Sequence, residues 1–385
     1  MYKAFKYRIY PTKEQSILLN KHIGASRFIY NLALEAKQMA WSSSRVNLSC
    51  FELQRQATDL KKECEWLGEI NAQTIQLSLV NLDSAYKSFL SGRGKFPKYK
   101  SKNNSRLSFG VRQYVRLQGD KVKIPKFQEG IKIELHRPIK GNIKRATISL
   151  TPTGRYFISI LCDTGEIPTL KPPISKQTSV GIDLGIKDFA ITSDGEVIEN
   201  PKYLRKAQSK LRYIQRKYSK HKGKCTKHRL VLLHEKVANQ RKDFLQKTST
   251  KLIRENQTIC LEDLAVSNMI KNHCLAQSIS DAGWGMFVSM LEYKAEWYGR
   301  NILRIGRFEP SSKTCSCCGT INKELTLKDR SWTCSECGVL HDRDINAACN
   351  IKSFALKNYV SGTDTQTRNE LPSLEGVTTS DALVG

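Results

Sequence analysis

Apolar positions along the first hundred residues follow two different periods. Residues 3–10 alternate between apolar and polar side chains and predict a strand, which Pro11 ends. Thr12 and Gln15 have the spacing of a capping box, which opens a helix. The basic, aromatic and glycine-rich segment 91–100 suits either a phosphate-and-stacking contact or a solvated loop. Between the strand and this segment, helical spacing of apolar residues extends over 17–41, 51–62 and 72–89.

Short alternating segments fill the stretch between residues 106 and 164. Five of them predict strands, at 112–117, 121–125, 131–135, 145–150 and 156–161. Glycine and asparagine residues between these segments supply turns. Short strands at this spacing favour a small antiparallel barrel, which residues 3–10 are able to join. Residues 171–173, Lys-Pro-Pro, then indicate a linker.

The second half of the chain has a different pattern. Residues 178–195 predict two strands with a turn at the end, and a long basic helical stretch follows with an interruption near Gly223. The remaining segments predict a strand at 258–264, a helix at 281–297, a strand at 301–305 and a helix at 344–354. A hairpin followed by alternating helices and strands predicts an α/β unit with a mixed sheet.

The charge of the chain points to its partners. Its 385 residues include 63 Lys and Arg against 36 Asp and Glu, a formal net charge of +27. Residues 201–256 alone hold 18 basic and three acidic residues, a local balance of +15. A surplus of this size is neutralised best by a polyanion, and counterion release then drives binding. We therefore expect a nucleic-acid partner.

Two further features of the sequence concern the cellular location of the protein and the disorder of its tail. No apolar run approaches the length of a membrane helix, and the first eight residues have no apolar signal region, so we expect an intracellular, cytoplasmic protein without a membrane partner. The tail 358–385 has four acids and one Arg, lacks periodicity and is predicted to be disordered.

Three carboxylates occupy positions that suit metal binding. Asp183 lies inside an apolar strand, Glu262 ends another, and Asp344 opens the last helix. An ionised Asp in an apolar strand is costly unless a cation binds it, and Mg²⁺ prefers carboxylate oxygen. Two such ions about 3.5–4 Å apart activate a water and stabilise the leaving oxygen of a phosphodiester. A rival interpretation of 181–185 is an ATPase phosphate loop, whose second loop has only Asp281-Ala-Gly283 as a candidate.

Five of the twelve cysteines crowd between residues 315 and 337. Cys315 and Cys318 form one Cys-x₂-Cys pair, and Cys334 and Cys337 form a second, with fifteen residues between the pairs. This spacing is typical of a zinc ribbon, and four cysteines leave no open position for catalysis, so we expect a structural zinc. Two alternatives remain open: Cys317 is a spare thiol in the first pair, and His341 is an outside candidate ligand.

The order of these features resembles that of TnpB, the OrfB-type protein of insertion sequences and relative of type V CRISPR nucleases. The resemblance covers the chain up to about residue 357. It rests on Tyr-Arg-Ile-Tyr-Pro-Thr-Lys-Glu-Gln near the start, Gly-Ile-Asp-Leu-Gly-Ile-Lys, Leu-Glu-Asp-Leu, Pro-Ser-Ser-Lys-Thr-Cys-Ser-x-Cys-Gly and Asp-Arg-Asp-Ile-Asn-Ala-Ala. The last two motifs are the specific ones. Asp183, Glu262 and Asp344 fall on the three metal-binding acids of the family, and the adjacent Asp263 and Asp342 are expected to be supporting or structural.

The resemblance implies an α+β multidomain fold: a small wedge-like β-barrel with an inserted helical lobe, then a RuvC-type, RNase H-like α/β nuclease domain that carries a zinc ribbon. The implied boundaries are 1–11 and 104–173 for the barrel, 12–103 for the helical recognition lobe, 174–310 and 342–357 for the nuclease domain, 311–341 for the ribbon and 358–385 for the tail.

The implied function is RNA-guided cleavage of double-stranded DNA next to a short flanking motif, by an enzyme encoded by an insertion sequence. It requires catalytic Mg²⁺, structural Zn²⁺ and a guide RNA derived from the transposon end, and it acts in the prokaryotic cytoplasm, on the nucleoid. Two alternative functions fit the same basic charge or the same three acids. One is a nuclease-inactive, guided DNA-binding regulator, and the other is a transposase that joins DNA strands.

Overall fold

The structure is a computed structural model that describes residues 1–103, 107–326 and 328–362. The chain divides into two compact units, Met1–Ile167 and Pro168–Gly385. The division falls a few residues before the predicted Lys-Pro-Pro linker. Among the described helices, none is both long and apolar enough to cross a membrane.

The first unit is built on a seven-stranded antiparallel sheet in the order β2-β6-β7-β1-β5-β4-β3. The first strand of the chain lies inside this sheet, since β1 pairs with β7 along one side and with β5 along the other. The strands are β1 (Tyr2–Tyr10), β2 (Leu107–Val111), β3 (Arg116–Gln118), β4 (Lys121–Ile124), β5 (Phe127–Glu134), β6 (Asn142–Leu150) and β7 (Tyr156–Asp163). The prediction that residues 3–10 join the later strands is therefore confirmed.

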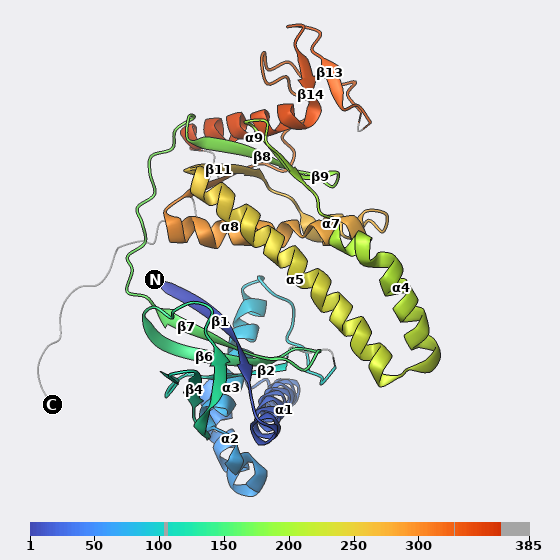
Figure 1. Cartoon of the computed structure of the whole chain (residues 1–385). Coiled ribbons are helices and arrows are strands. Elements are labelled where there is room, and N and C mark those ends of the chain that lie inside the picture. The colour runs from blue at the N-terminus through green and yellow to red at the C-terminus, as the bar shows by residue number, and fades with distance from the viewer. Residues whose placement is uncertain (104–106, 327, 363–385) are drawn as a thin grey trace, which may run out of the picture. The chain divides into compact units, whose positions relative to one another are not determined.

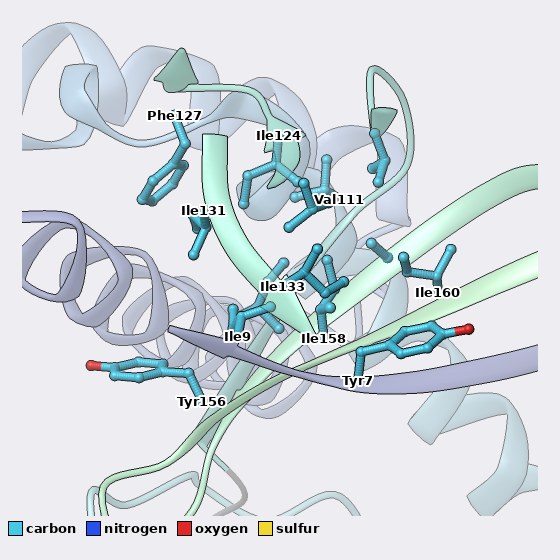
Figure 2. Packing of buried hydrophobic residues seen from close by; sticks show 14 of the residues in the cluster. Tyr7, Ile9, Val111, Ile124, Phe127, Ile131, Ile133, Tyr156, Ile158 and Ile160 are labelled. Carbon is cyan, nitrogen blue, oxygen red and sulfur yellow. The ribbon is translucent and has the colours of Figure 1, made fainter. Parts of the chain in front are cut away.

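The sheet of the first unit curls around one apolar core, as a small barrel does. Tyr7 and Ile9 alternate inward on β1, and they share a buried cluster with Val111 from one end of the sheet and with Ile124 from near the other. Figure 2 shows these side chains converging with Ile133 between the strands. Burial of apolar surface from both ends of the sheet in one cluster stabilises its curvature.

Three helices form the lobe inserted between β1 and β2: α1 (Lys13–Ser44), α2 (Cys50–Glu63) and α3 (Ala72–Leu90). The predicted capping box at Thr12 and Gln15 is present, with each side chain bonded to the backbone of the other residue. The short 3-10 helix η1 (Glu65–Glu69) links α2 to α3. Residues 91–100 fold back onto this lobe, where Phe96 packs edge-on against Tyr86 and Phe89 on α3.

One predicted strand of the first unit, 112–117, is right only at its end, where β3 begins at Arg116, and β2 was not predicted. The segment 112–117 is interrupted at Tyr114, whose φ of 62° places it in the left-handed region that a strand does not allow. The strand that precedes it, β2, contains Gly110, a residue that weakens strand signals. The sequence pattern therefore began β3 too early and missed β2.

The second unit contains a five-stranded mixed sheet in the order β10-β9-β8-β11-β12. The strands β8, β11 and β12 are parallel, whereas β9 and β10 extend the sheet by antiparallel hairpins. The bounds are β8 (Ser179–Leu184), β9 (Asp188–Thr192), β10 (Val197–Glu199), β11 (Thr258–Glu262) and β12 (Asn301–Ile305). This is the mixed sheet that the sequence predicts, with β10 as a third strand after the expected turn.

Helices cover both faces of this sheet (Figure 1). On one face, Val180, Ile182, Ile259 and Leu261 pack with α5 and α8. On the other face, Cys260 and residues of β12 pack against α9. The helices are α4 (Tyr203–His221), α5 (Lys224–Glu255), α6 (Val266–Met269), α7 (Ala276–Ala282), α8 (Trp284–Tyr298) and α9 (Arg343–Val360). The predicted interruption of the basic helical stretch is confirmed at Gly223, which lies between α4 and α5.

Two helix boundaries differ from the prediction. The helix expected over 281–297 is two helices, because Gly283 has a φ of 72° and ends α7 before α8 begins. The last helix runs to Val360, so the predicted tail begins too early, at residue 358. The rest of that predicted tail, 363–385, lies outside the described residues.

Candidate functional site

Asp183 and Glu262 lie at the same edge of the sheet and on the same face. The strands β8 and β11 are parallel neighbours, with Leu261 level with Ile182. One step further along this register brings Glu262 level with Asp183. Side chains alternate along a strand, so Asp183 shares its face with Gly181, and Glu262 shares its face with Cys260, which packs toward α9. Both carboxylates therefore lie on the face that α9 covers.

The helix α9 brings Asp344 to this edge. It approaches β8 so closely that a Cβ atom on Gly181 would lie 2.1 Å from the carbonyl oxygen of Ala348. Ala348 lies about one helical turn after Asp344, so the first turn of α9 reaches the neighbourhood of Asp183. The glycine of the Gly-Ile-Asp motif thus has a structural reason: only a residue without a side chain allows this packing.

The electrostatics of Asp183 reflect the two other acids. The pKa of Asp183 rises from 3.8 to about 7: burial is the largest cause, the charges of Glu262 and Asp344 add to it, and Arg343 opposes it. A carboxylate in this environment is stabilised by a bound cation. Hard oxygen donors that repel one another fit a divalent ion such as Mg²⁺. Within the described part of the chain, these three acids do not form a group whose ligand atoms all lie within 4.8 Å.

Glu262 is held by a partner that the sequence did not reveal. The hydroxyl of Ser311 donates a hydrogen bond of 2.5 Å to Oε1 of Glu262. Ser311 is itself fixed, because the side chain of Asn350 on α9 donates to its carbonyl oxygen at 2.8 Å. The Pro-Ser-Ser motif before the cysteines therefore orients a carboxylate, a role that depends on chain folding and leaves no signal in the sequence.

Asp344 is partnered by Arg330, at 3.4 Å, from the segment between the two cysteine pairs. The adjacent Asp342 caps α9, accepting hydrogen bonds from the backbone N–H groups of Asp344 and Ile345. Such a cap satisfies helix donors that otherwise lack partners. Asp342 thus has the structural role that was expected of it.

Asp263 also has a structural partner, although it lies next to Glu262. The guanidinium of Arg307 contacts its carboxylate at 2.8 Å, and that of Arg304 lies 3.9 Å away. Asp281 is likewise occupied, since it accepts hydrogen bonds from the backbone of α4 and pairs with Arg241. This use of Asp281 as a structural cap argues against the ATPase interpretation.

The four predicted cysteines come together. The sulfur atoms of Cys315, Cys318, Cys334 and Cys337 all lie within 4.8 Å of one another. The pair Cys318–Cys334 is 3.5 Å apart and the pair Cys315–Cys337 is 3.7 Å apart. A tetrahedral zinc with Zn–S bonds of about 2.3 Å separates its sulfur atoms by about 3.8 Å, so the four thiols fit this ion.

The sequence left open two further candidate zinc ligands, Cys317 and His341, and they lie in different surroundings. Cys317 is exposed and lies outside the four-cysteine group. His341 is buried, stacks on Trp332, and places Nε2 3.0 Å from the sulfur of Cys315. Hydrogen bonds with the side chain and the backbone of Thr320 lower the pKa of Cys318 to about 6, which favours the thiolate that a metal binds.

The cysteine segment is fastened to α9 by buried asparagines. Asn346 accepts a hydrogen bond from the backbone N–H of Ser316 and donates one to the carbonyl of Thr314. Asn350, one turn later, donates to the same Thr314 carbonyl at 2.6 Å. The Asn-Ala-Ala-Cys-Asn sequence thus presents two amides on one helical face, and they hold the ribbon beside the first turn of α9.

Three family models match the chain. Residues 1–45 match one described as a helix-turn-helix domain, 159–273 match a probable transposase, and 284–351 match a Cas12f1-like TNB domain. The structure gives the first of these segments as β1 followed by the single helix α1.

Similar proteins share nearly the whole length of the chain. A protein of Streptomyces pristinaespiralis named "Putative RNA-guided DNA endonuclease" is 40% identical over 92% of this chain and 89% of its own length. A protein of Escherichia coli named "Putative RNA-guided DNA endonuclease InsQ" is 30% identical over 91% of each chain. The fold is similar to that in a structure of a Cas12f1–sgRNA–target DNA complex, with a TM-score of 0.57, 15% identity, and coverage of 89% of this chain and 83% of that one.

Proposed function

This chain belongs to the TnpB (OrfB_IS605) family, and on that premise we propose that it is an RNA-guided DNA endonuclease encoded by an insertion sequence. Its guide is an RNA derived from the transposon end, and its substrate is double-stranded DNA beside a short flanking motif. Base pairing selects the sequence, while the protein reads the flanking duplex and the backbone. It meets its target in the prokaryotic cytoplasm.

The acids Asp183, Glu262 and Asp344 hold the Mg²⁺ ions of the reaction in this proposal. When bound, these ions activate a water and stabilise the leaving oxygen of the phosphodiester. The residues of the chain prepare the ligands: Ser311 fixes one carboxylate oxygen of Glu262, and α9 sets the position of Asp344. The observation that supports this assignment is the raised pKa of Asp183, which both other acids help to cause.

Zn²⁺ has a separate, structural role in the proposal. Held by Cys315, Cys318, Cys334 and Cys337, it folds the ribbon that carries Arg330 to Asp344 and Ser311 to Glu262. A structural zinc supplies on the order of 10 kcal/mol of local folding free energy. Loss of zinc is therefore expected to disturb the acids through the ribbon.

Cleavage and binding of a matched duplex should be measured together, with wild type and with Asp183→Ala, each loaded with its guide RNA. The variant is expected to lose cutting and to keep RNA and target binding, because the basic segment 201–256 is untouched. Asp194→Ala is a matched control, since this exposed acid follows the next strand, β9. Wild-type cutting by Asp183→Ala would refute the site, and cutting without guide would refute the mechanism.

The same assay separates the two alternative functions. A guided regulator binds the duplex and leaves it uncut in wild type as well. A strand-joining transposase yields joined products in place of free ends. Either outcome would replace the endonuclease proposal.

A further inference from the structure

A polar cavity of about 370 Å³ lies in the second unit beside the end of β8. Ile186, two residues beyond that strand, forms part of its wall, and the rest comes mainly from α4 and α7. Three residues of extended chain span at most about 11 Å, so Ile186 lies within that reach of Asp183. Asp183 faces α9, and the cavity lies on the side of α7, with the edge of the sheet between them.

The lining of this cavity has cations without acidic partners. Lys202, Arg205 and Arg212 all contribute to it, and none of the three forms an ion pair with any residue in the described part of the chain. The acid of the cavity is Asp281, which is already occupied: it accepts hydrogen bonds from the backbone N–H groups of Leu204 and Arg205 at 3.0–3.2 Å and pairs with Arg241 at 3.3 Å. Arg205 and Arg212 are exposed and Lys202 is half-buried, so these cations are accessible to a ligand phosphate.

The polar residues are arranged on one stripe of α4. Arg205, Gln208 and Arg212 are spaced by three and four residues, so they lie along one face of the helix. Gln208 donates a hydrogen bond of 3.3 Å to the amide oxygen of Gln277 on α7. The two amides thus lie between the two guanidinium groups along the stripe, and each retains further donors and acceptors.

The start of α4 is held in a costly conformation. Lys202 has a φ of 50° and a ψ of 47°, the left-handed region that a lysine rarely adopts. Asn200 maintains it, because its side chain accepts from the N–H of Lys202 at 3.1 Å and donates to the carbonyl of Ile186 at 2.8 Å. One asparagine therefore ties the end of β8 to the cations at the start of α4.

We propose that this cavity binds one nucleotide of the DNA strand being cut, close to the scissile phosphodiester. Arg205, Arg212 and Lys202 contact the phosphate, and the amides of Gln208 and Gln277 contact the edge of the base. Amides that offer both donors and acceptors accept any base, which suits an enzyme whose sequence choice comes from base pairing. This inference rests on the proposed endonuclease function and adds a place where the strand is held.

The first test compares two double variants that remove the same charge from the same helix. Arg205→Gln with Arg212→Gln alters the cavity, whereas Arg216→Gln with Lys217→Gln alters exposed cations outside it. Each is placed in the Asp183→Asn background without Mg²⁺, and binding of a short single-stranded DNA is titrated against salt. The cavity pair is expected to lower the affinity at least tenfold and to reduce the log–log salt slope by about 0.7, from the one phosphate that the cavity contacts. Equal effects of the two pairs would overturn the proposal.

The second test identifies the strand and works on the guide-loaded complex. A photoreactive thymidine is placed next to the scissile phosphate of the DNA, and in a parallel sample a photoreactive uridine is placed in the guide RNA. Crosslinks from the DNA to peptides containing residues 200–212 or 276–281 are expected. Crosslinks to these peptides from the guide alone, or DNA crosslinks only elsewhere, would overturn the assignment. If wild type fails to cut or to bind RNA, the endonuclease proposal fails, while the oligonucleotide titration still tests the cavity.

Discussion

Replacing Asp183 by Asn is expected to stabilise the metal-free protein while removing its activity. The pKa of this carboxyl rises from 3.8 to about 7 on folding. The folded protein therefore keeps a proton that the unfolded chain releases, and stability falls by about 1.4 kcal/mol per pH unit between these values. Above pH 7 the cost is constant at roughly 4 kcal/mol, an upper limit because the surroundings relax around the charge. Asn carries no charge and escapes this cost.

The pH dependence is the sharp part of this prediction. The raised pKa of Asp183 lowers the stability of the folded protein by roughly 2 kcal/mol near pH 5.5 and by roughly 4 kcal/mol near pH 8. The stability advantage of Asn therefore grows by about 2 kcal/mol between these pH values. For a unit of this size that difference is worth about 4–8 °C in Tm. Differential scanning calorimetry in buffers freed of Mg²⁺, at both pH values, measures it.

A matched control and an added ion complete the experiment. Asp194→Asn changes an exposed acid and should leave Tm unaltered at both pH values. Added Mg²⁺ should raise the Tm of wild type by mass action and have much less effect on Asp183→Asn. An equal advantage of Asn at both pH values, or none at either, would show that folding does not raise the pKa of Asp183 as burial and its neighbours require.

The remaining predictions concern the zinc, the basic segment and the support of Glu262. Elemental analysis should find one zinc per chain in wild type and in Cys317→Ser and far less in Cys337→Ser, and zinc retained in full by Cys337→Ser would contradict the four-thiol site. Reversing several basic residues within 201–256 should lower guide-RNA affinity and flatten its salt slope by about 0.7–0.9 per lost phosphate contact, whereas an unchanged slope would mean that this segment faces solvent. Ser311→Ala should lower the cleavage rate about 10- to 100-fold and raise the Mg²⁺ concentration needed for half-maximal rate, with target binding intact; an unchanged Mg²⁺ requirement would separate Ser311 from the metal ligands.

The sequence predicted most elements because local pattern decides them. The alternation of residues 3–10 and the capping box at Thr12 depend on neighbouring residues only, and both are confirmed. The errors arose where one residue's backbone conformation overrides the pattern. Tyr114 and Gly283 both adopt a positive φ, so one predicted strand is shortened and one predicted helix is divided.

The candidate site was predictable only in part, for a related reason. An acid inside an apolar strand is conspicuous, which is how Asp183 was found. Ser311 and Arg330 look like ordinary surface residues in the sequence, and they acquire their partners only when the ribbon folds back beside α9. The cavity beside β8 was hidden in the same way, since its cations belong to a segment that is basic throughout.

The contact between Gly181 and α9 has a consequence for how this protein is able to vary. At Gly181 the strand meets the main chain of α9 directly, so a side chain at this position would push the helix that carries Asp344 away from Asp183. Everything between the end of β12 and the start of α9, the whole ribbon included, loops out from two anchored ends. Within that segment, the parts that contact neither the acids nor α9 can lengthen, shorten or change their sequence, whereas Ser311 and Arg330 must keep their places beside Glu262 and Asp344.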